Sequence, residues 1–221
     1  MGDRVAKDAL FDGFAEVAKA LANGRRAELV DVLAQGERHV DALADEIGQS
    51  VATTSFHLRA LAGAGLVTTR RDGTRVYYRL ASPAVEALWA SVRQVASDHV
   101  DMLDALAAAY LGDRRGIDEI TRDELADRRQ DGSVVVIDVR PTAEFEAGHI
   151  VGARSIPLDD LAGSIAELPS GLEVVAYCRG PFCVFADDAV RALRRRRRKA
   201  RRLVEGYPEW RDAGLPVAQG A

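Results

Sequence analysis

The spacing of apolar residues changes halfway along this chain, and that change constrains the fold more than any other feature. In the first half, apolar residues recur at helical spacing in short runs that end at glycines such as Gly36, Gly48 and Gly63. In the second half, continuous apolar runs at 133–138 and 173–177 alternate with helical segments, as in a parallel sheet covered by helices. With 221 residues, 48% of them apolar, the chain can form two cores. We expect a mainly α-helical domain over residues 1–112 and a three-layer α/β domain with a parallel sheet over residues 113–221.

The first half predicts helices followed by a β-hairpin. The expected helices cover residues 10–21, 27–33, 40–47 and 51–62. Ser50 is a suitable N-cap for the last of them. Two β-prone runs, 66–71 and 74–80, flank Asp72-Gly73 and indicate a hairpin. Ser82-Pro83 then begins a long helix, which we expect to continue to Leu111.

Helix, turn, helix and hairpin in this order are typical of a winged helix-turn-helix, whose second helix enters the major groove of DNA. On that helix we expect Val51, Thr54, Leu58 and Leu61 to face the core. Small hydroxyls and arginines suit base edges and phosphates. The candidate DNA contacts lie on the outer face of the helix and on the hairpin: Thr53, Ser55, Phe56, His57, Arg59, Arg70, Arg71 and Arg75. The net charge of −4 conceals this basic surface.

Several segments of the first half carry a family resemblance: Ala20-Leu-Ala-Asn-Gly-Arg-Arg26, Val40-Asp-Ala-Leu-Ala44, Thr53-Thr-Ser-Phe-His-Leu58, Leu61-Ala-Gly-Ala-Gly-Leu-Val67 and Arg71-Asp-Gly-Thr-Arg-Val-Tyr-Tyr78. Residues 10–110 resemble an ArsR-type winged-helix repressor. The resemblance implies a homodimer on a roughly palindromic double-stranded operator, with the N-terminal helix and the 83–111 helix at the dimer interface. Where many members of that family hold metal with a cysteine pair, this chain has His39 and Asp41, and its last helix has only His99. We therefore expect no metal site and no cofactor.

Both cysteines lie in one short segment between a buried strand and a helix. In α/β sheets, ligand sites lie at the carboxyl ends of strands, and the N–H groups at a helix start favour a thiolate. Cys178 is therefore the candidate nucleophile. The candidate active-site loop continues through Arg179, Gly180, Pro181, Phe182, Cys183 and Val184. A cysteine phosphatase, or a similar arsenate reductase, would have an arginine where this chain has Val184, so those two classes are excluded.

The second half also carries a family resemblance, in Val136-Ile-Asp-Val-Arg-Pro141, Glu144-Phe145, Gly148-His-Ile-Val-Gly-Ala153, Ile156-Pro157 and Gly206-Tyr-Pro-Glu-Trp-Arg-Asp-Ala-Gly-Leu-Pro216. Residues 117–217 resemble a single-domain rhodanese. The resemblance implies that Cys178 forms a persulfide with sulfur from a sulfane-sulfur donor, a persulfide or thiosulfate. Asp138, Arg140 and His149 match structural motifs of that family. Cys183 either lines the loop or resolves an oxidised Cys178 into a disulfide, and the sequence leaves both open.

The six consecutive basic residues 194–199 are either a solvated face, an auxiliary DNA contact or a funnel for anionic donors. No apolar stretch reaches the roughly 18–20 residues of a membrane span, and two cysteines do not make a disulfide scaffold, so we expect a cytoplasmic protein with no membrane partner.

The leading hypothesis is a repressor whose fused rhodanese accepts sulfane sulfur on Cys178, which then gates operator binding. In the alternative, the chain is first a thiosulfate or persulfide sulfurtransferase, and its DNA-binding half only localises or autoregulates it. In a third reading, the rhodanese is a protein-interaction module without chemistry.

Overall fold

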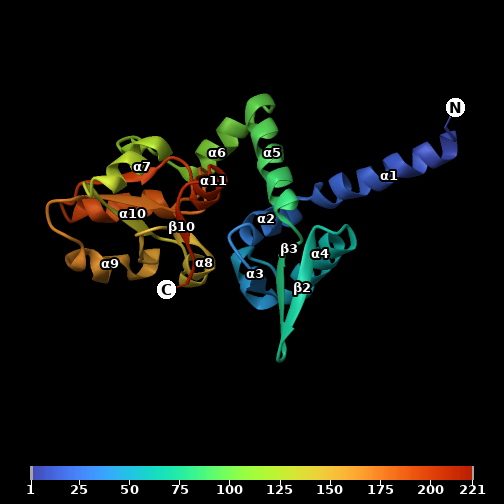
Figure 1. Cartoon of the computed structure of the whole chain (residues 1–221), viewed down its shortest axis with the longest axis horizontal. Helices are drawn as coiled ribbons and strands as arrows, with labels where there is room; N and C mark the ends of the chain where they lie inside the picture. Colours follow the sequence, from blue (N-terminus) through green and yellow to red (C-terminus); the bar gives the residue numbers. More distant parts are fainter. Residues whose placement is uncertain (1, 221) are drawn as a thin grey trace. The chain divides into compact units, whose positions relative to one another are not determined.

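The computed structural model describes residues 2–220, which divide into two compact units between Val100 and Asp101 (Figure 1). Each unit has its own apolar core, and the two are described separately. No helix among the described residues is long and apolar enough to cross a membrane.

The first unit contains five helices and a small antiparallel sheet. The helices are α1 (Arg4–Leu21), α2 (Gly24–Leu33), α3 (Val40–Glu46), α4 (Val51–Gly63) and α5 (Pro83–His99). The strands are β1 (Arg38–His39), β2 (Val67–Asp72) and β3 (Arg75–Leu80), in the order β1-β3-β2. Buried leucines and valines of α2, α3 and α4 form the core, with Leu66 and Val67 of the segment that leads into β2. Of α1, only Ala20 is buried, and the helix extends away from the rest of its unit (Figure 1).

The hairpin predicted around Asp72-Gly73 is confirmed. Asp72 pairs with Arg75, so Gly73 and Thr74 form the turn. Gly73 has a φ of 58°, at the position where a two-residue hairpin turn favours glycine. The paired strands extend beyond the helices of this unit (Figure 1).

The single helix predicted from Pro83 to Leu111 is wrong. The chain instead forms α5 and a separate helix α6 (Leu103–Leu111), and Val100 between them is extended, with φ −106° and ψ 95°. Residues 97–101 are Ser-Asp-His-Val-Asp, and all of these residue types rank low in helix propensity. The apolar periodicity on either side concealed this break.

The second unit is a five-stranded parallel sheet with helices on both faces, as predicted. The strands are β4 (Glu119–Ile120), β5 (Val134–Asp138), β7 (Arg154–Ser155), β8 (Glu173–Tyr177) and β9 (Ala200–Leu203), in the order β4-β9-β8-β5-β7. Two further strands, β6 (His149–Ile150) and β10 (Val217–Ala218), pair with each other. Besides α6, the helices are α7 (Arg122–Gln130), α8 (Thr142–Ala147), α9 (Leu161–Ser164), α10 (Phe185–Arg195) and α11 (Tyr207–Asp212).

Alternate side chains of the central strands enter two different cores. Ile137 and Val174 pack with α9 and α10 on one face, whereas Val136 and Val175 pack with α7 and α11 on the other. This alternation produces the three layers. Between Leu158 and Glu167 the chain is helical but irregular: two 3₁₀ turns (Leu158–Asp160 and Ile165–Glu167) flank the four-residue α9, in a stretch weakened by two aspartates and a glycine.

Candidate functional site

The outer face of α4 presents part of the predicted DNA-binding set. The Ser50 hydroxyl accepts a hydrogen bond from the Thr53 N–H at 3.1 Å and caps the helix, as predicted. Thr54, Leu58 and Leu61 are fully buried and fix the rotation of the helix. Consequently Phe56, with 61% of its surface exposed, and Arg59 lie on the open side.

The remaining predicted positions on α4 are less exposed. Thr53, Ser55 and His57 are half-buried, and His57 turns its Nδ1 inward, where it has no hydrogen-bond partner among the described residues. The prediction that Val51 faces the core is wrong, because 42% of its surface is exposed. Val51 is the first residue of α4, and the first turn of the helix lies beyond the core that begins at Thr54.

The hairpin arginines differ in their engagement with the protein. Arg70 is bonded to Glu37 at 2.5 Å and to Asp72 at 3.2 Å, and its guanidinium lies 4.7 Å from the centre of the Tyr77 ring. Arg71 and Arg75 are exposed and make no hydrogen bond or ion pair within the described part of the chain. Strand alternation places Arg70 and Arg75 on one face of the hairpin and Arg71 on the other. Arg71 and Arg75 are thus the hairpin cations available to a ligand.

His39 has a structural role at the start of α3. Its Nδ1 accepts a hydrogen bond from the Ala42 N–H at 3.3 Å and caps the helix. Over residues 2–220, no group of three or more potential metal ligands gathers.

The two cysteines of the second unit share one backbone cradle at the carboxyl end of β8. Cys178 is buried, with 2% of its surface exposed, and its sulfur is bonded to the N–H groups of Gly180 and Ala186. The sulfur of Cys183 is bonded to the N–H groups of Arg179 and Phe185, and the two thiols are hydrogen-bonded to each other. The cradle therefore extends past the predicted loop into the first turn of α10.

The expectation that the surroundings of Cys178 favour its thiolate is wrong. Burial raises the pKa of Cys178 well above its ordinary value, and the bond to Cys183 raises it further. The pKa of Cys183 is lowered, mainly because the Cys178 thiol donates a hydrogen bond to it and also because backbone N–H groups point at its sulfur. Of the two thiols, Cys183 is therefore the one that loses its proton more readily.

The loop is held from several sides. Arg179 donates to Glu144 of α8, from Nε to Oε1 at 3.0 Å and to Oε2 at 3.1 Å and from Nη2 to Oε1 at 2.5 Å, and Glu144 is 1% exposed. The Tyr207 N–H donates to the Cys178 carbonyl at 3.1 Å. A β-carbon on Gly206 would lie 2.5 Å from the Gly180 Cα, and closer still to Gly180 N and Arg179 C. The other predicted loop positions are peripheral: Phe182 is 38% exposed, and Val184 is the N-cap of α10.

Arg114, which sequence reasoning missed, fastens this loop to the segment that follows α6. Its Nε donates to the fully buried Asp187 of α10 at 2.6 Å. Its two terminal nitrogens donate to the carbonyls of Pro181 at 3.1 Å and Cys183 at 3.4 Å. The Arg114 side chain thus contacts both the cysteine loop and α10, while its backbone belongs to the segment that follows α6.

Asp138 and Arg140 form a fully buried ion pair at the carboxyl end of β5. Arg140 also donates a hydrogen bond to the Gly148 carbonyl at 2.7 Å. His149 stacks on Phe145 with the ring centres 3.6 Å apart. These contacts hold strands and turns together, which is consistent with structural roles.

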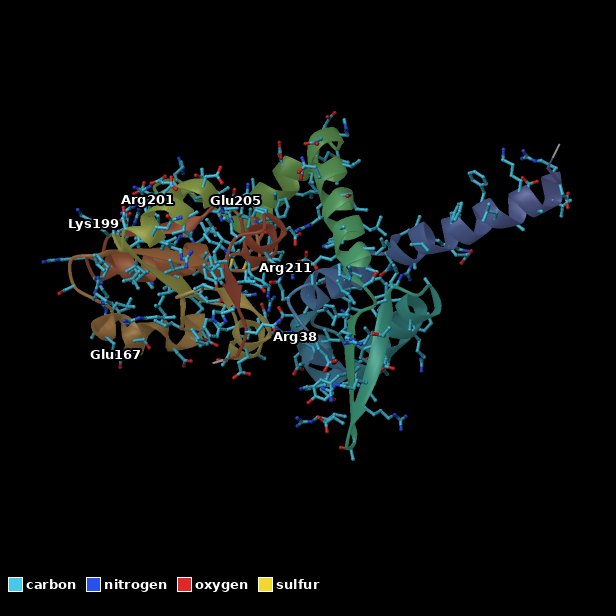
Figure 2. All side chains as sticks on the ribbon, in the orientation of Figure 1. Arg38, Glu167, Lys199, Arg201, Glu205 and Arg211 are labelled. Carbon is cyan, nitrogen blue, oxygen red and sulfur yellow. The ribbon has the colours of Figure 1, made fainter. Side chains whose placement is uncertain are left out.

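Two residues of the basic run, Arg194 and Arg198, donate hydrogen bonds to backbone carbonyls of the same unit. Arg194 donates to the Gly116 and Ala200 carbonyls and to Asp118, and Arg198 donates to the Leu168 and Pro169 carbonyls. Arg201, labelled in Figure 2, binds Glu124 and Glu173. The solvated remainder comprises Arg195, Arg196, Arg197 and Lys199.

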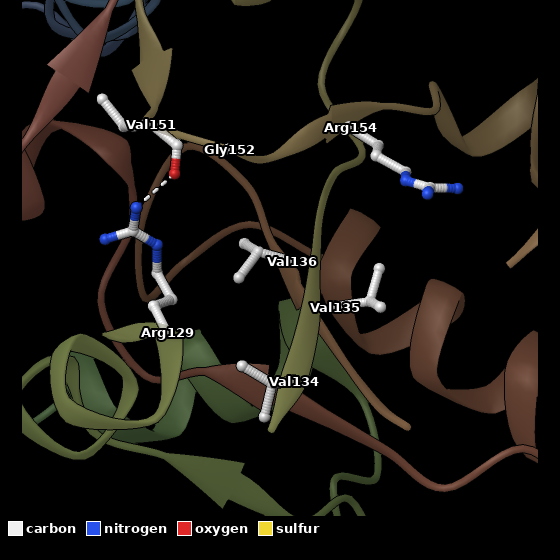
Figure 3. Close-up of a pocket in the computed structure, with 7 residues that line it drawn as sticks. All are labelled: Arg129, Val134, Val135, Val136, Val151, Gly152 and Arg154. Carbon is white, nitrogen blue, oxygen red and sulfur yellow. Dashed lines mark hydrogen bonds between the residues drawn. The ribbon is translucent and has the colours of Figure 1, made fainter. Parts of the chain in front are cut away.

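A cavity of about 250 Å³ lies away from the cysteines, against the amino-terminal part of β5 (Figure 3). Val134, Val135 and Val136 line it, together with Arg129 and Arg154. Arg129 already donates to the Val151 carbonyl and stacks on Trp210, with its guanidinium 5.5 Å from the ring centre. None of the residues that line this cavity belongs to the cysteine loop.

Comparison with known proteins divides the chain in the same way. Residues 23–69 match the family described as "Bacterial regulatory protein, arsR family", and residues 121–213 match "Rhodanese-like domain". The HTH-type transcriptional regulator Rv0324 of Mycobacterium tuberculosis is 50% identical over 220 residues, which are 100% of this chain and 96% of that protein. The protein YqhL of Bacillus subtilis is 32% identical over 106 residues, 48% of this chain and 81% of YqhL. The solution structure of a homodimeric winged helix-turn-helix DNA-binding domain from Mycobacterium bovis is 50% identical, covers 46% of this chain and 92% of that fragment, and has a TM-score of 0.43.

Proposed function

Because the chain belongs to the ArsR family of bacterial transcriptional regulators and carries a rhodanese-like domain, we propose that it is a cytoplasmic operator-binding repressor gated by sulfane sulfur. Cys178 accepts the sulfur atom from a low-molecular-weight persulfide or thiosulfate. Loading of the loop then weakens operator binding by the first unit.

The bonding of Arg114 is the observation that carries this proposal. Its guanidinium bonds two carbonyls of the cysteine loop, and its backbone lies in the segment that joins the sheet domain to α6. A sulfur atom added to the buried Cys178 needs space, and the loop must move to provide it. Because Arg114 binds the Cys183 carbonyl, that movement changes the bonds of a residue whose chain leads to α6 and α5.

The operator-binding form is a homodimer in this proposal. Large apolar side chains are exposed on three helices: Val5, Leu10, Phe11 and Phe14 on α1, Leu88, Val92 and Val95 on α5, and Leu106 and Tyr110 on α6. Such surfaces are typical of interfaces. A dimer would present two copies of α4 and the hairpin to two half-sites of double-stranded DNA.

The test measures sulfur loading and DNA binding on the same samples. Operator duplexes are first selected from random DNA with the reduced protein. Intact mass and released hydrosulfide after treatment with glutathione persulfide then report sulfur transfer to Cys178, whether the sulfur is retained or passed on. Fluorescence anisotropy reports operator affinity. We expect loading to weaken binding by about 10²-fold, or roughly 2.7 kcal/mol, which is what a useful switch requires.

Two variants separate the parts of the proposal. Cys178→Ser should bind the operator as the reduced wild type does and should ignore the donor. Arg114→Gln should still gain sulfur but lose most of the change in affinity, because its side chain cannot bridge the same three acceptors. A Cys178→Ser protein that still releases DNA on treatment refutes the gating. Sulfur uptake without any change in affinity favours the alternative of a sulfurtransferase localised by its DNA-binding half.

A further inference from the structure

We propose that Cys183 is the resolving thiol of this loop, which attacks the persulfide on Cys178, closes a Cys178–Cys183 disulfide and releases hydrosulfide. This inference rests on the proposed function, because it requires that Cys178 first accept a sulfur atom. The substrate class is a low-molecular-weight persulfide, and the loop acts on it as a dithiol rather than as a single nucleophile.

The placement of the two thiols provides the geometric basis. They are hydrogen-bonded to each other, so no backbone or side chain separates the two sulfurs. Both are unoxidised in this structure, with Cys178 buried and Cys183 half-buried. Cys183 packs against the core cluster that contains Cys178 and Ala186, so its side chain is turned inward toward the other sulfur.

The backbone supports a negative charge on either sulfur in turn. Two N–H groups point at Cys178, from Gly180 and Ala186, and two at Cys183, from Arg179 and Phe185. Arg179 adds a favourable charge near Cys183, and its own position is fixed by the buried Glu144. The charge can therefore pass between the sulfurs as the proton shifts along their hydrogen bond.

The N–H groups that point at the Cys183 sulfur distinguish a thiol that resolves the persulfide from a thiol that only lines the loop. A lining thiol needs only space, and burial alone would raise its pKa. At Cys183, by contrast, the N–H groups of Arg179 and Phe185 point at the sulfur, and these donors remain after Cys178 has taken up sulfur, so they can stabilise an attacking thiolate.

The reaction balances without an added oxidant. The proton of the pair shifts to Cys183, and the Cys178 thiolate attacks the sulfane sulfur of glutathione persulfide. The bond between the two sulfurs of the donor breaks, and the leaving glutathione thiolate takes the proton from Cys183. The Cys183 thiolate then attacks Cys178 Sγ, and the bond from Sγ to the added sulfur breaks. Hydrosulfide leaves with that bond's electron pair. The two thiols lose two electrons, and the sulfane sulfur gains them as it becomes sulfide.

The test compares the full-length wild-type protein with Cys183→Ser, and with Cys183→Ala as a second variant. Each reduced protein receives one equivalent of glutathione persulfide, and intact mass and free hydrosulfide are followed together. Wild type should lose the mass of two hydrogen atoms and release one hydrosulfide per chain. Both Cys183 variants should retain one added sulfur atom on Cys178 and release none. Peptide mapping should find the Cys178–Cys183 disulfide in wild type.

The outcomes separate this inference from the proposed function. If wild type and both variants hold the added sulfur equally long, Cys183 does not resolve the persulfide, although Cys178 is still a sulfur acceptor. If neither wild type nor either variant gains sulfur or releases hydrosulfide, Cys178 is not an acceptor, and the proposed function fails together with its extension. If wild type releases hydrosulfide and neither variant gains sulfur, Cys183 is needed for loading itself, and its role as the resolving thiol is refuted.

Discussion

Gly206 offers a direct test of how closely the cysteine loop is packed. The residue has no unusual backbone angle, with φ −117° and ψ −167°, so any residue could adopt its conformation. Its hydrogen atom nevertheless faces the backbone of Arg179 and Gly180 at the start of the loop. The substitution Gly206→Ala therefore changes the space beside the loop and leaves local backbone preference unaffected.

The required movement follows from the packing distances. The added β-carbon would lie 2.3 Å from the Gly180 N, whereas ordinary contacts begin at 3.4 Å, so the two backbones must separate by about 1.1 Å. The neighbouring Tyr207 N–H holds the Cys178 carbonyl, so the movement is transmitted to the nucleophile itself. A displacement of about 1 Å can cost roughly 10²-fold in rate at a reacting centre. We expect sulfur loading of Cys178 to slow by about that factor.

The assay is the rate of sulfur uptake from glutathione persulfide, followed by intact mass under single-turnover conditions in chains that also carry Cys183→Ser, so that the added sulfur stays on Cys178. Gly163→Ala is the matched control, because a β-carbon on Gly163 in α9 meets nothing within 4 Å. The control should load at the wild-type rate. Loading of Gly206→Ala at the rate of this control would refute the reasoning, since the loop would then tolerate the displacement.

Three further predictions concern the helix end, the hairpin and the thiol pair. Arg197 has a φ of 60° just beyond α10, and the N–H groups of Arg197 and Arg198 bond back to the Arg194 and Leu193 carbonyls in the manner of a Schellman motif. Arg197→Gly should therefore raise the free energy of unfolding of this unit by about 0.5–1 kcal/mol in urea titrations. Arg195→Gly, at the last residue of the helix, should instead lower it, by at most about 1 kcal/mol. Arg75→Ala should reduce the slope of log operator affinity against log salt concentration by about 1, as expected for one lost phosphate contact. Arg70→Ala should hardly change this slope, because the Arg70 side chain is already bonded to Glu37. Equal slopes for wild type and Arg75→Ala would contradict a phosphate contact by Arg75. Cys178 donates the hydrogen bond that lowers the pKa of Cys183, so wild type should lose its first thiol proton at a lower pH than either Cys178→Ala or Cys183→Ala. Ultraviolet absorbance of the thiolate measures this pH. A first deprotonation at lower pH in either variant would contradict the hydrogen bond between the two thiols.

Features that depend on neighbouring residues in the chain could be predicted from sequence. Ser50 caps α4, and the hairpin turns at Gly73, because the chemistry of caps and turns is local. The buried strands β5 and β8 follow from continuous apolar runs. The break at Val100 also has a local cause, the five weak helix formers at 97–101. One continuous helix was nevertheless predicted there, because the apolar residues on both sides recur at helical spacing.

Features that depend on distant residues could not be predicted. Arg114 meets Asp187 across 73 positions of sequence, and nothing near Arg114 distinguishes it from other surface arginines. The contacts of the basic run 194–199 also depend on distant residues. Its charge density indicated a solvated or anion-binding face, but Arg194 and Arg198 find backbone carbonyl acceptors that only the folded chain brings near.

The cysteine pair shows that the identity of a nucleophile and the location of its charge are separate properties. A thiol after a strand and before a helix was expected to be acidic, because N–H groups and the helix start stabilise a thiolate. The N–H groups are present at Cys178, but its burial outweighs them and raises its pKa, whereas the pKa of the less buried Cys183 is lowered. Local sequence specifies the donors around a sulfur, whereas only the packing of the whole sheet determines how far that sulfur is from water. In this loop the position that the rhodanese resemblance assigns as nucleophile is therefore the less acidic of the two thiols.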